Sequence, residues 1–185
     1  MGMPAQKLSL HEFIEWENAQ PEKNEFVNGE VFAMVGARRS HGAIVANLVQ
    51  KLANHFAGSP CRVFCEGMKV QVAGDAILYP DVFVTCDPAD LRTEQIFRSP
   101  LVVIEVLSPS THGYDRSVKF ALYRRLNSLR EYVLIDPETR RVEAFRVGAD
   151  GLWVLHDMSG QASLAIPAID ATIAMTEVFS GVDAA

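Results

Sequence analysis

Apolar residues recur at helical spacing in three stretches of the chain. Ser9 followed by Glu12 fits a capping box, and the apolar positions after Ser9 share one face of a helix that runs to about residue 18. A second helix is expected with Ser40 as its N-cap and Gly58 just past its end, because apolar residues repeat every four positions between them. The segment 115–126 shows a similar stripe and predicts a third amphipathic helix.

Other segments alternate with a period of two or contain continuous apolar runs, as strands do. The dipeptide Asn28-Gly29 lies between two apolar segments and predicts a β-hairpin over residues 25–34, because both positions tolerate positive φ. Further strands are expected at residues 61–66, 69–72, 77–85, 101–107, 131–135, 141–147 and 152–155.

The segment 101–135 reads as strand, helix, strand. Its first strand has apolar residues on both faces, which suits a central strand, and such a crossover places its two strands parallel. A helical turn is expected near residues 176–179. The order of elements predicts an α/β fold with a mixed β-sheet flanked by helices. No linker or repeat interrupts it, so residues 1–185 are expected to form a single domain.

The composition excludes several classes of protein. With 185 residues, 49% hydrophobic and 22% charged, the chain can bury a core without disulfides or a structural metal. A net charge of −6 and a pI near 5.3 exclude a protein that binds nucleic acid through a large basic surface, although they do not exclude a local basic patch. We see no membrane span and no signal-peptide run, so a cytoplasmic location is expected.

The cysteines also favour a cytoplasmic location. Cys61, Cys65 and Cys86 are few and odd in number, which favours a reducing compartment. The spacing of Cys61 and Cys65 matches no metal or redox motif. We therefore expect these two residues to fill apolar strand positions.

Glu105 is the most informative residue. It lies among Val103, Ile104 and Val106, where a carboxylate is costly to bury without a cation or hydrogen-bond donors. A solvated strand end or an ion pair with an arginine is one interpretation, and a metal ligand or acid–base group is the other. We favour the functional interpretation.

Asp81 is the second candidate. An aspartate after proline, as in Pro80-Asp81, is often a turn residue. However, Asp81 also begins an apolar strand, and the number of residues between Asp81 and Glu105 suits two neighbouring strands. Two such carboxylates can share one hard divalent cation such as Mg²⁺.

Lys119 lies in the helix that follows the Glu105 strand, where Asp115, Lys119 and Tyr123 line one side. An exposed ion pair between Asp115 and Lys119 is the simpler interpretation. The helix begins near the end of the strand, so the lysine can also reach back toward the carboxylates. Two acidic residues and a lysine are the set that metal-assisted phosphodiester hydrolysis requires.

The blocks YPDVFV, LVVIEVLSPST, YDRSVKFALYRR and EYVLIDP resemble the Uma-two family of restriction-type endonucleases, which belongs to the PD-(D/E)XK nuclease superfamily. The resemblance extends over residues 10–179. It implies a restriction-endonuclease-like fold, a Mg²⁺ or Mn²⁺ cofactor, a nucleic-acid substrate (DNA is expected) and a homodimer.

Residue by residue, the resemblance places the metal ligands on Asp81 and Glu105. The motif lysine should follow Glu105 by two positions, where this chain has Leu107, and the family pattern moves it to Lys119. An acidic residue from the N-terminal part often completes such sites, and Glu30 is the candidate, although an exposed strand-end position would explain it equally well. Tyr123 can hydrogen-bond near Lys119 or lie in the core.

The positive clusters include Arg38, Arg39, Arg116 and Arg124, which could contact phosphates or form solvated helix faces. His41 could approach the site from a helix start or lie on the surface. The main hypothesis is a Mg²⁺-dependent endonuclease. The alternatives are a catalytically inactive nucleic-acid- or protein-binding module of the same fold, favoured by the acidic pI and Leu107, and a metal-dependent hydrolase with another substrate.

Overall fold

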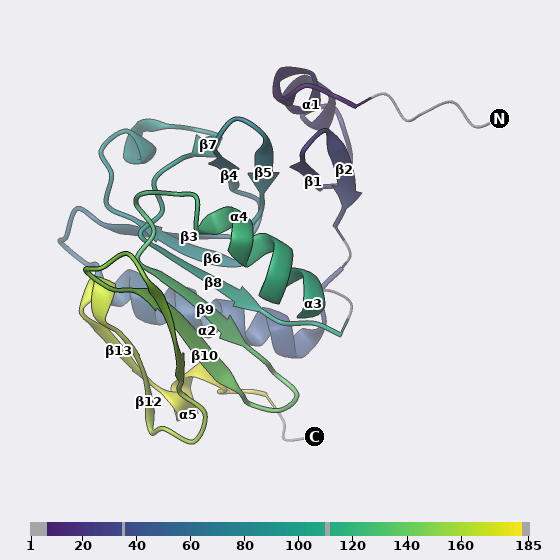
Figure 1. Cartoon of the computed structure of the whole chain (residues 1–185). Helices are drawn as coiled ribbons and strands as arrows, with labels where there is room; N and C mark the ends of the chain where they lie inside the picture. Colours follow the sequence, from purple (N-terminus) through teal and green to yellow (C-terminus); the bar gives the residue numbers. More distant parts are fainter. Residues whose placement is uncertain (1–6, 35, 110–111, 183–185) are drawn as a thin grey trace.

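A six-stranded mixed sheet forms the centre of the molecule (Figure 1). The computed structural model describes residues 7–34, 36–109 and 112–182. Along the sheet the strands are β11 (Trp153–Asp157), β10 (Val142–Val147), β9 (Glu131–Ile135), β8 (Val102–Val106), β6 (Val82–Thr85) and β3 (Arg62–Cys65). β8 and β9 run parallel, and every other neighbouring pair in this sheet is antiparallel.

Two smaller sheets accompany the central one. The first contains, in order, β2 (Glu30–Ala33), β1 (Asn24–Val27), β5 (Ala76–Leu78), β4 (Lys69–Val72) and β7 (Ile96–Phe97). The second is a two-stranded sheet of β12 (Ser163–Ile166) and β13 (Ala171–Ala174).

Helices cover both faces of the central sheet, with α2 (Arg39–His55) on one face and α3 (His112–Tyr114), a π-helical turn η2 (Asp115–Lys119) and α4 (Phe120–Tyr123) on the other (Figure 1). α1 (Leu10–Glu17) precedes β1, and α5 (Met175–Val178) follows β13. Short 3₁₀ turns occupy Asp90–Arg92 and Pro167–Ile169.

Side-chain alternation in β8 separates two cores. Val102, Ile104 and Val106 pack in the cluster that contains the buried face of α2. Val103 packs in the cluster that contains the α4 residues Leu122 and Tyr123. Because successive side chains of a strand point to opposite faces, Glu105 must share the α4 side with Val103.

Several sequence predictions are confirmed. Ser9 and Glu12 form the capping box of α1, with both reciprocal hydrogen bonds present. Asn28 and Gly29 connect β1 to β2 with φ of +51° and +90°, as an Asn-Gly hairpin requires. The strand–helix–strand unit places β8 parallel to β9, also as predicted.

Other predictions are wrong. The single strand expected over residues 77–85 is two strands in different sheets, β5 and β6, because Pro80 has no N–H to donate and ends the ladder. Ser40 is not an N-cap, since α2 begins at Arg39 with Arg38 as its cap. The helix expected over 115–126 begins at His112 and ends at Tyr123. The strands β7, β12 and β13 were not predicted.

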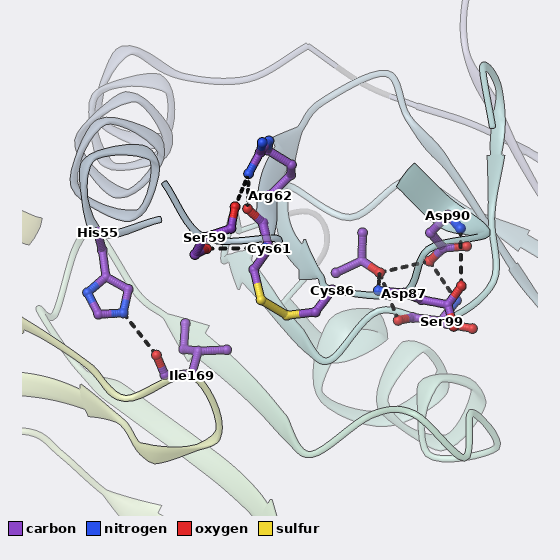
Figure 2. Close-up of a disulfide and its surroundings, with 10 residues drawn as sticks. His55, Ser59, Cys61, Arg62, Cys86, Asp87, Asp90, Ser99 and Ile169 are labelled. Carbon is purple, nitrogen blue, oxygen red and sulfur yellow. Dashed lines mark hydrogen bonds between the residues drawn. A yellow bond between two sulfur atoms is a disulfide. The ribbon is translucent and has the colours of Figure 1, made fainter. Parts of the chain in front are cut away.

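Cys61 and Cys86 form a disulfide, shown in Figure 2. β3 pairs with β6 so that Arg62 lies opposite Thr85, and one more step along both strands places the two cysteines opposite each other, with their Cα atoms 4.1 Å apart. The prediction that Cys61 only fills an apolar position is therefore wrong, and the cysteine argument for a reducing compartment does not hold. Cys65 is a free thiol.

None of the helices in the described part of the chain has the length and apolarity that a membrane span requires. Ser110 and Thr111, which belong to the predicted loop after β8, lie outside the described residues.

Candidate active site

Glu105 lies inside the molecule, with 1% of its surface exposed, near the end of β8. β6 runs antiparallel to β8 with Val82 opposite Ile104, so the next pair outward is Asp81 with Glu105. The backbone N–H of Asp81 donates to Glu105 Oε2 (3.2 Å), and the N–H of Val106 donates to Asp81 Oδ2 (2.7 Å). The strand register therefore brings the two predicted carboxylates together.

Lys119 provides the positive charge of the site. Its ammonium lies 3.1 Å from Glu25 Oε1, 3.3 Å from Glu105 Oε1 and 3.5 Å from Asp115 Oδ1, and the side chain is almost wholly buried. Lys119 ends the π-helical turn, a distortion that is frequent at functional sites. The lysine thus reaches Glu105 from the following helix.

The N-terminal acidic residue of the site is Glu25, whereas the predicted Glu30 is exposed on β2. Glu25 is 4% exposed on β1, and its Oε1 also accepts the backbone N–H of Tyr79 (3.0 Å). Sequence reasoning missed Glu25, although a carboxylate next to Phe26 and Val27 is the same signal that singled out Glu105.

Charge and burial act against each other in this cluster. Burial raises the pKa of Glu105 well above its ordinary value, although the Lys119 ammonium opposes the shift. Burial alone would lower the pKa of Lys119, but Glu105, Glu25 and Asp115 outweigh it and raise that pKa well above its ordinary value. The lysine is therefore held as an ammonium ion.

Tyr123 lies fully buried on α4, and its hydroxyl has no hydrogen-bond partner among the described residues. Burial, followed by the charges of Glu105 and Glu25, raises the pKa of Tyr123 well above its ordinary value. The neighbouring Tyr132 donates its hydroxyl to the Asp115 carbonyl (2.9 Å), and its ring is tilted by 37° to the Tyr123 ring. Tyr123 is thus a neutral phenol close to the carboxylates.

His41, on the first turn of α2, also reaches the site. Its Nε2 lies 3.1 Å from Asp81 Oδ2, and the side chain is 8% exposed. Burial lowers the pKa of His41, but the hydrogen bond and charge of Asp81 outweigh it and raise the pKa above its ordinary value. Of the two positions considered for His41 from the sequence, the structure gives the one at the site.

The four arginines predicted to contact phosphates each have an interaction within the described structure. Arg38 pairs with Glu138 (2.7 Å) on the surface, and Arg39 donates to the carbonyl of Gly181 (3.0 Å). Arg116 pairs with the buried Glu143, and the Arg124 guanidinium lies 4.8 Å from the ring centre of Phe120. Each arginine therefore interacts with a group of its own chain.

The donor set fits a divalent cation. Three carboxylates (Glu25, Glu105 and Asp115) pair with the ammonium of Lys119, and Asp81 lies next to Glu105, so acidic groups outnumber basic ones in this part of the described structure. Such an excess is costly unless a cation joins it. Asp81 and Glu105 carry carboxylate oxygens, the ligands that Mg²⁺ and Mn²⁺ accept.

Comparison with known proteins finds relatives that match most of the chain. A relative from Synechocystis sp., described as "Uncharacterized protein slr1290", is 34% identical over 179 residues, which is 96% of this chain and 94% of that protein. A second one from the same organism, "Uncharacterized protein sll1609", is 31% identical over 157 residues, 83% of this chain and 89% of that protein.

A crystal structure from Anabaena variabilis ATCC 29413, described as "a putative nuclease belonging to DUF820", superposes with a TM-score of 0.73 at 21% identity. It covers 94% of this chain and 98% of its own, so the fold is restriction-endonuclease-like. The model of the family described as "Uma2: Putative restriction endonuclease" matches residues 10–176. The chain therefore belongs to the Uma2 family.

Proposed function

We propose that the chain is a metal-dependent endonuclease that hydrolyses phosphodiester bonds in DNA. The observation that carries the proposal is the meeting of Asp81, Glu105 and Lys119, which lie just before β6, in β8 and in the π-helical turn after β8. The family and the fold of the chain support it.

In this proposal Asp81 and Glu105 hold a Mg²⁺ or Mn²⁺ ion. When bound, such an ion polarises a phosphate oxygen and lowers the pKa of its water. Lys119 is held as an ammonium, so it stabilises the charge that develops on the phosphate and does not act as a general base. Glu25 and Asp115 position Lys119 through their ion pairs.

In this proposal Tyr123 has a minor role. Its hydroxyl has no partner among the described residues, so it can donate a hydrogen bond near Lys119. Glu30 is too exposed to share this site, and Glu25 takes its place in the proposal. Arg38, Arg39, Arg116 and Arg124 remain candidates for phosphate contacts, which would require them to exchange their present partners.

The alternative is a catalytically inactive binding module of the same fold. Leu107 favours it, because this buried residue occupies the position of the motif lysine. The two functions differ in what they require of the carboxylates. A module that only binds has no need of Asp81 and Glu105 as metal ligands, whereas an endonuclease loses its activity without them.

Cleavage of a supercoiled plasmid at low salt tests the proposal. We expect nicking with Mg²⁺ or Mn²⁺ by the wild type and by Glu94→Gln, an exposed acidic control. We expect at least a 100-fold lower rate for Glu105→Gln. Equal rates for wild type and Glu105→Gln would mean that a contaminating nuclease cuts the plasmid. Binding of the plasmid without cleavage would favour the binding module. Either result would overturn the endonuclease proposal.

A homodimer and a cytoplasmic location complete the proposal, and the homodimer rests on the resemblance to restriction-type endonucleases. Light scattering on the eluted protein measures the assembly. Thiol labelling in intact cells measures whether Cys61 and Cys86 are oxidised, and a permanent disulfide would argue against the cytoplasm.

A further inference from the structure

Phe32 keeps an exposed aromatic ring beside the candidate active site. It lies on β2, the outer strand of its sheet, and 40% of its surface is exposed. In the register of the hairpin Phe32 lies directly opposite Glu25, so the two side chains point to the same face. On that face Glu25 contacts the ammonium of Lys119 (3.1 Å). The exposed ring therefore lies on the face of the hairpin that contributes to the site.

Tyr114 connects this ring to Lys119. The ring centres of Phe32 and Tyr114 are 6.1 Å apart, and the two planes are tilted by 36°. On the other side, the Lys119 ammonium lies 6.0 Å from the centre of the Tyr114 ring, within reach of a cation–π contact. Burial, followed by the charge of Glu25, raises the pKa of Tyr114 well above its ordinary value, so its phenol stays neutral. The three side chains form a continuous row from the buried ammonium to the exposed ring.

The charge of the chain limits how it can hold a nucleic acid. At a net charge of −6 the protein as a whole has little attraction for a phosphate backbone. The four arginines considered above already interact with groups of their own chain. Stacking of a base on an aromatic side chain requires no positive charge, and every base offers a flat face for it. An exposed ring next to the site therefore supplies a contact that the charges do not.

We propose that Phe32 stacks on an unpaired nucleobase next to the phosphate that the site cleaves, so that single-stranded DNA is the preferred substrate. The inference rests on the proposed function and adds its substrate class. Inside a duplex both faces of a base are covered by its neighbours, whereas a base in a single strand can turn out onto a side chain. Nicking of a supercoiled plasmid is compatible with this preference, because negative supercoiling favours local strand opening. Phe32 backed by Tyr114 is called the stacking platform below.

Fluorescence anisotropy of labelled strands in a chelator tests the platform, because it measures binding without cleavage. The probes are oligothymidine, an abasic strand of the same length and charge, and the oligothymidine duplex with oligoadenine. We expect the wild type to bind oligothymidine about 10-fold more tightly than either other probe, and Phe32→Ala to lose this preference. Phe32→Trp should keep it, since any large aromatic ring can stack.

Val31→Ala is the matched control. Val31 is 37% exposed on the same strand, but it lies opposite Phe26 and so points to the other face of the hairpin. This variant should bind all three probes as the wild type does. A purely structural role of Phe32 would weaken the binding of oligothymidine and of the abasic strand alike, and would leave their ratio unchanged.

The outcomes separate the two proposals. Base-dependent binding that requires Phe32, with no plasmid cleavage by the wild type, would support the platform and overturn the endonuclease. Cleavage that requires Glu105, with equal binding of oligothymidine by wild type and Phe32→Ala, would overturn the platform and leave the endonuclease standing. Equal binding of oligothymidine and the abasic strand by the wild type, or binding of neither, would overturn this inference. A dimer that becomes a monomer in Phe32→Ala would also overturn it, because the ring would then be covered by a second copy of the chain.

Discussion

Replacing Glu105 by glutamine should make the metal-free protein more stable. The carboxylate is fully buried, and Lys119, its one cationic neighbour among the described residues, also serves Glu25 and Asp115. Glutamine keeps an oxygen that can accept the Asp81 N–H and removes the charge. Lys119 would still be paired with two carboxylates.

The magnitude follows from known buried charges. Replacing a buried ion pair by neutral residues of similar size is often neutral or stabilises proteins by about 1–4 kcal/mol, and this range applies here because Lys119 keeps two carboxylate partners. At roughly 2–4 °C per kcal/mol for a chain of this length, we expect Tm to rise by roughly 2–16 °C in the presence of a chelator.

The gain should depend on pH. The pKa of Glu105 is raised in the folded protein, so the native state prefers the protonated carboxyl. Below the unfolded pKa of about 4.3 both states hold the proton, and the variant gains little. As pH rises from there toward the folded pKa, Glu105 ionises in the unfolded protein but stays protonated in the folded one. The wild type therefore becomes less stable, and its difference in Tm from Glu105→Gln should grow.

Thermal unfolding of both proteins from pH 5 to 8 in a chelator measures the effect. Glu131→Gln is the matched control, because Glu131 is equally buried but its partner Arg146 (3.1 Å) pairs with no other carboxylate among the described residues, whereas Glu105 shares Lys119 with Glu25 and Asp115. That control should lower Tm. A Glu105→Gln protein that is less stable than the wild type would refute the reasoning and make Glu105 a structural ion-pair member.

Three further substitutions give measurable outcomes. Lys119→Met leaves the carboxylates without their ammonium, and should lower the free energy of unfolding by about 3–5 kcal/mol in urea titrations; a change below 1 kcal/mol would contradict the buried cluster. Cys61→Ser removes the disulfide and should cost about 2–4 kcal/mol, whereas Cys65→Ser should cost little; equal stability under oxidising conditions would count against the bond. Tyr123→Phe removes a buried hydroxyl that has no hydrogen-bond partner among the described residues. The free energy of unfolding should stay unchanged or rise by about 1 kcal/mol, and a clear loss would reveal a hydrogen bond.

Local patterns in the sequence were enough for the elements that depend on nearby residues. The capping box of Ser9 and Glu12, the Asn28-Gly29 hairpin and the continuous apolar strand around Glu105 each follow from interactions within a few positions. The same local argument marked Glu105, because a carboxylate inside an apolar strand is conspicuous in any context.

Long-range pairing decided what the sequence left open. Pro80 divides one predicted strand between two sheets, and the register of β3 against β6 joins Cys61 to Cys86 and places Glu66 beside Asp81. The pairing of β1 also placed Glu25, and not the predicted Glu30, beside Lys119.

Composition, helix caps, the hairpin and the most buried strands were therefore determined by the sequence itself. The choice of Glu25, the approach of His41 and the disulfide were decided by tertiary structure. The physical reason is that a strand's side-chain direction is a local property, whereas its partner and register depend on how distant apolar faces are buried against one another.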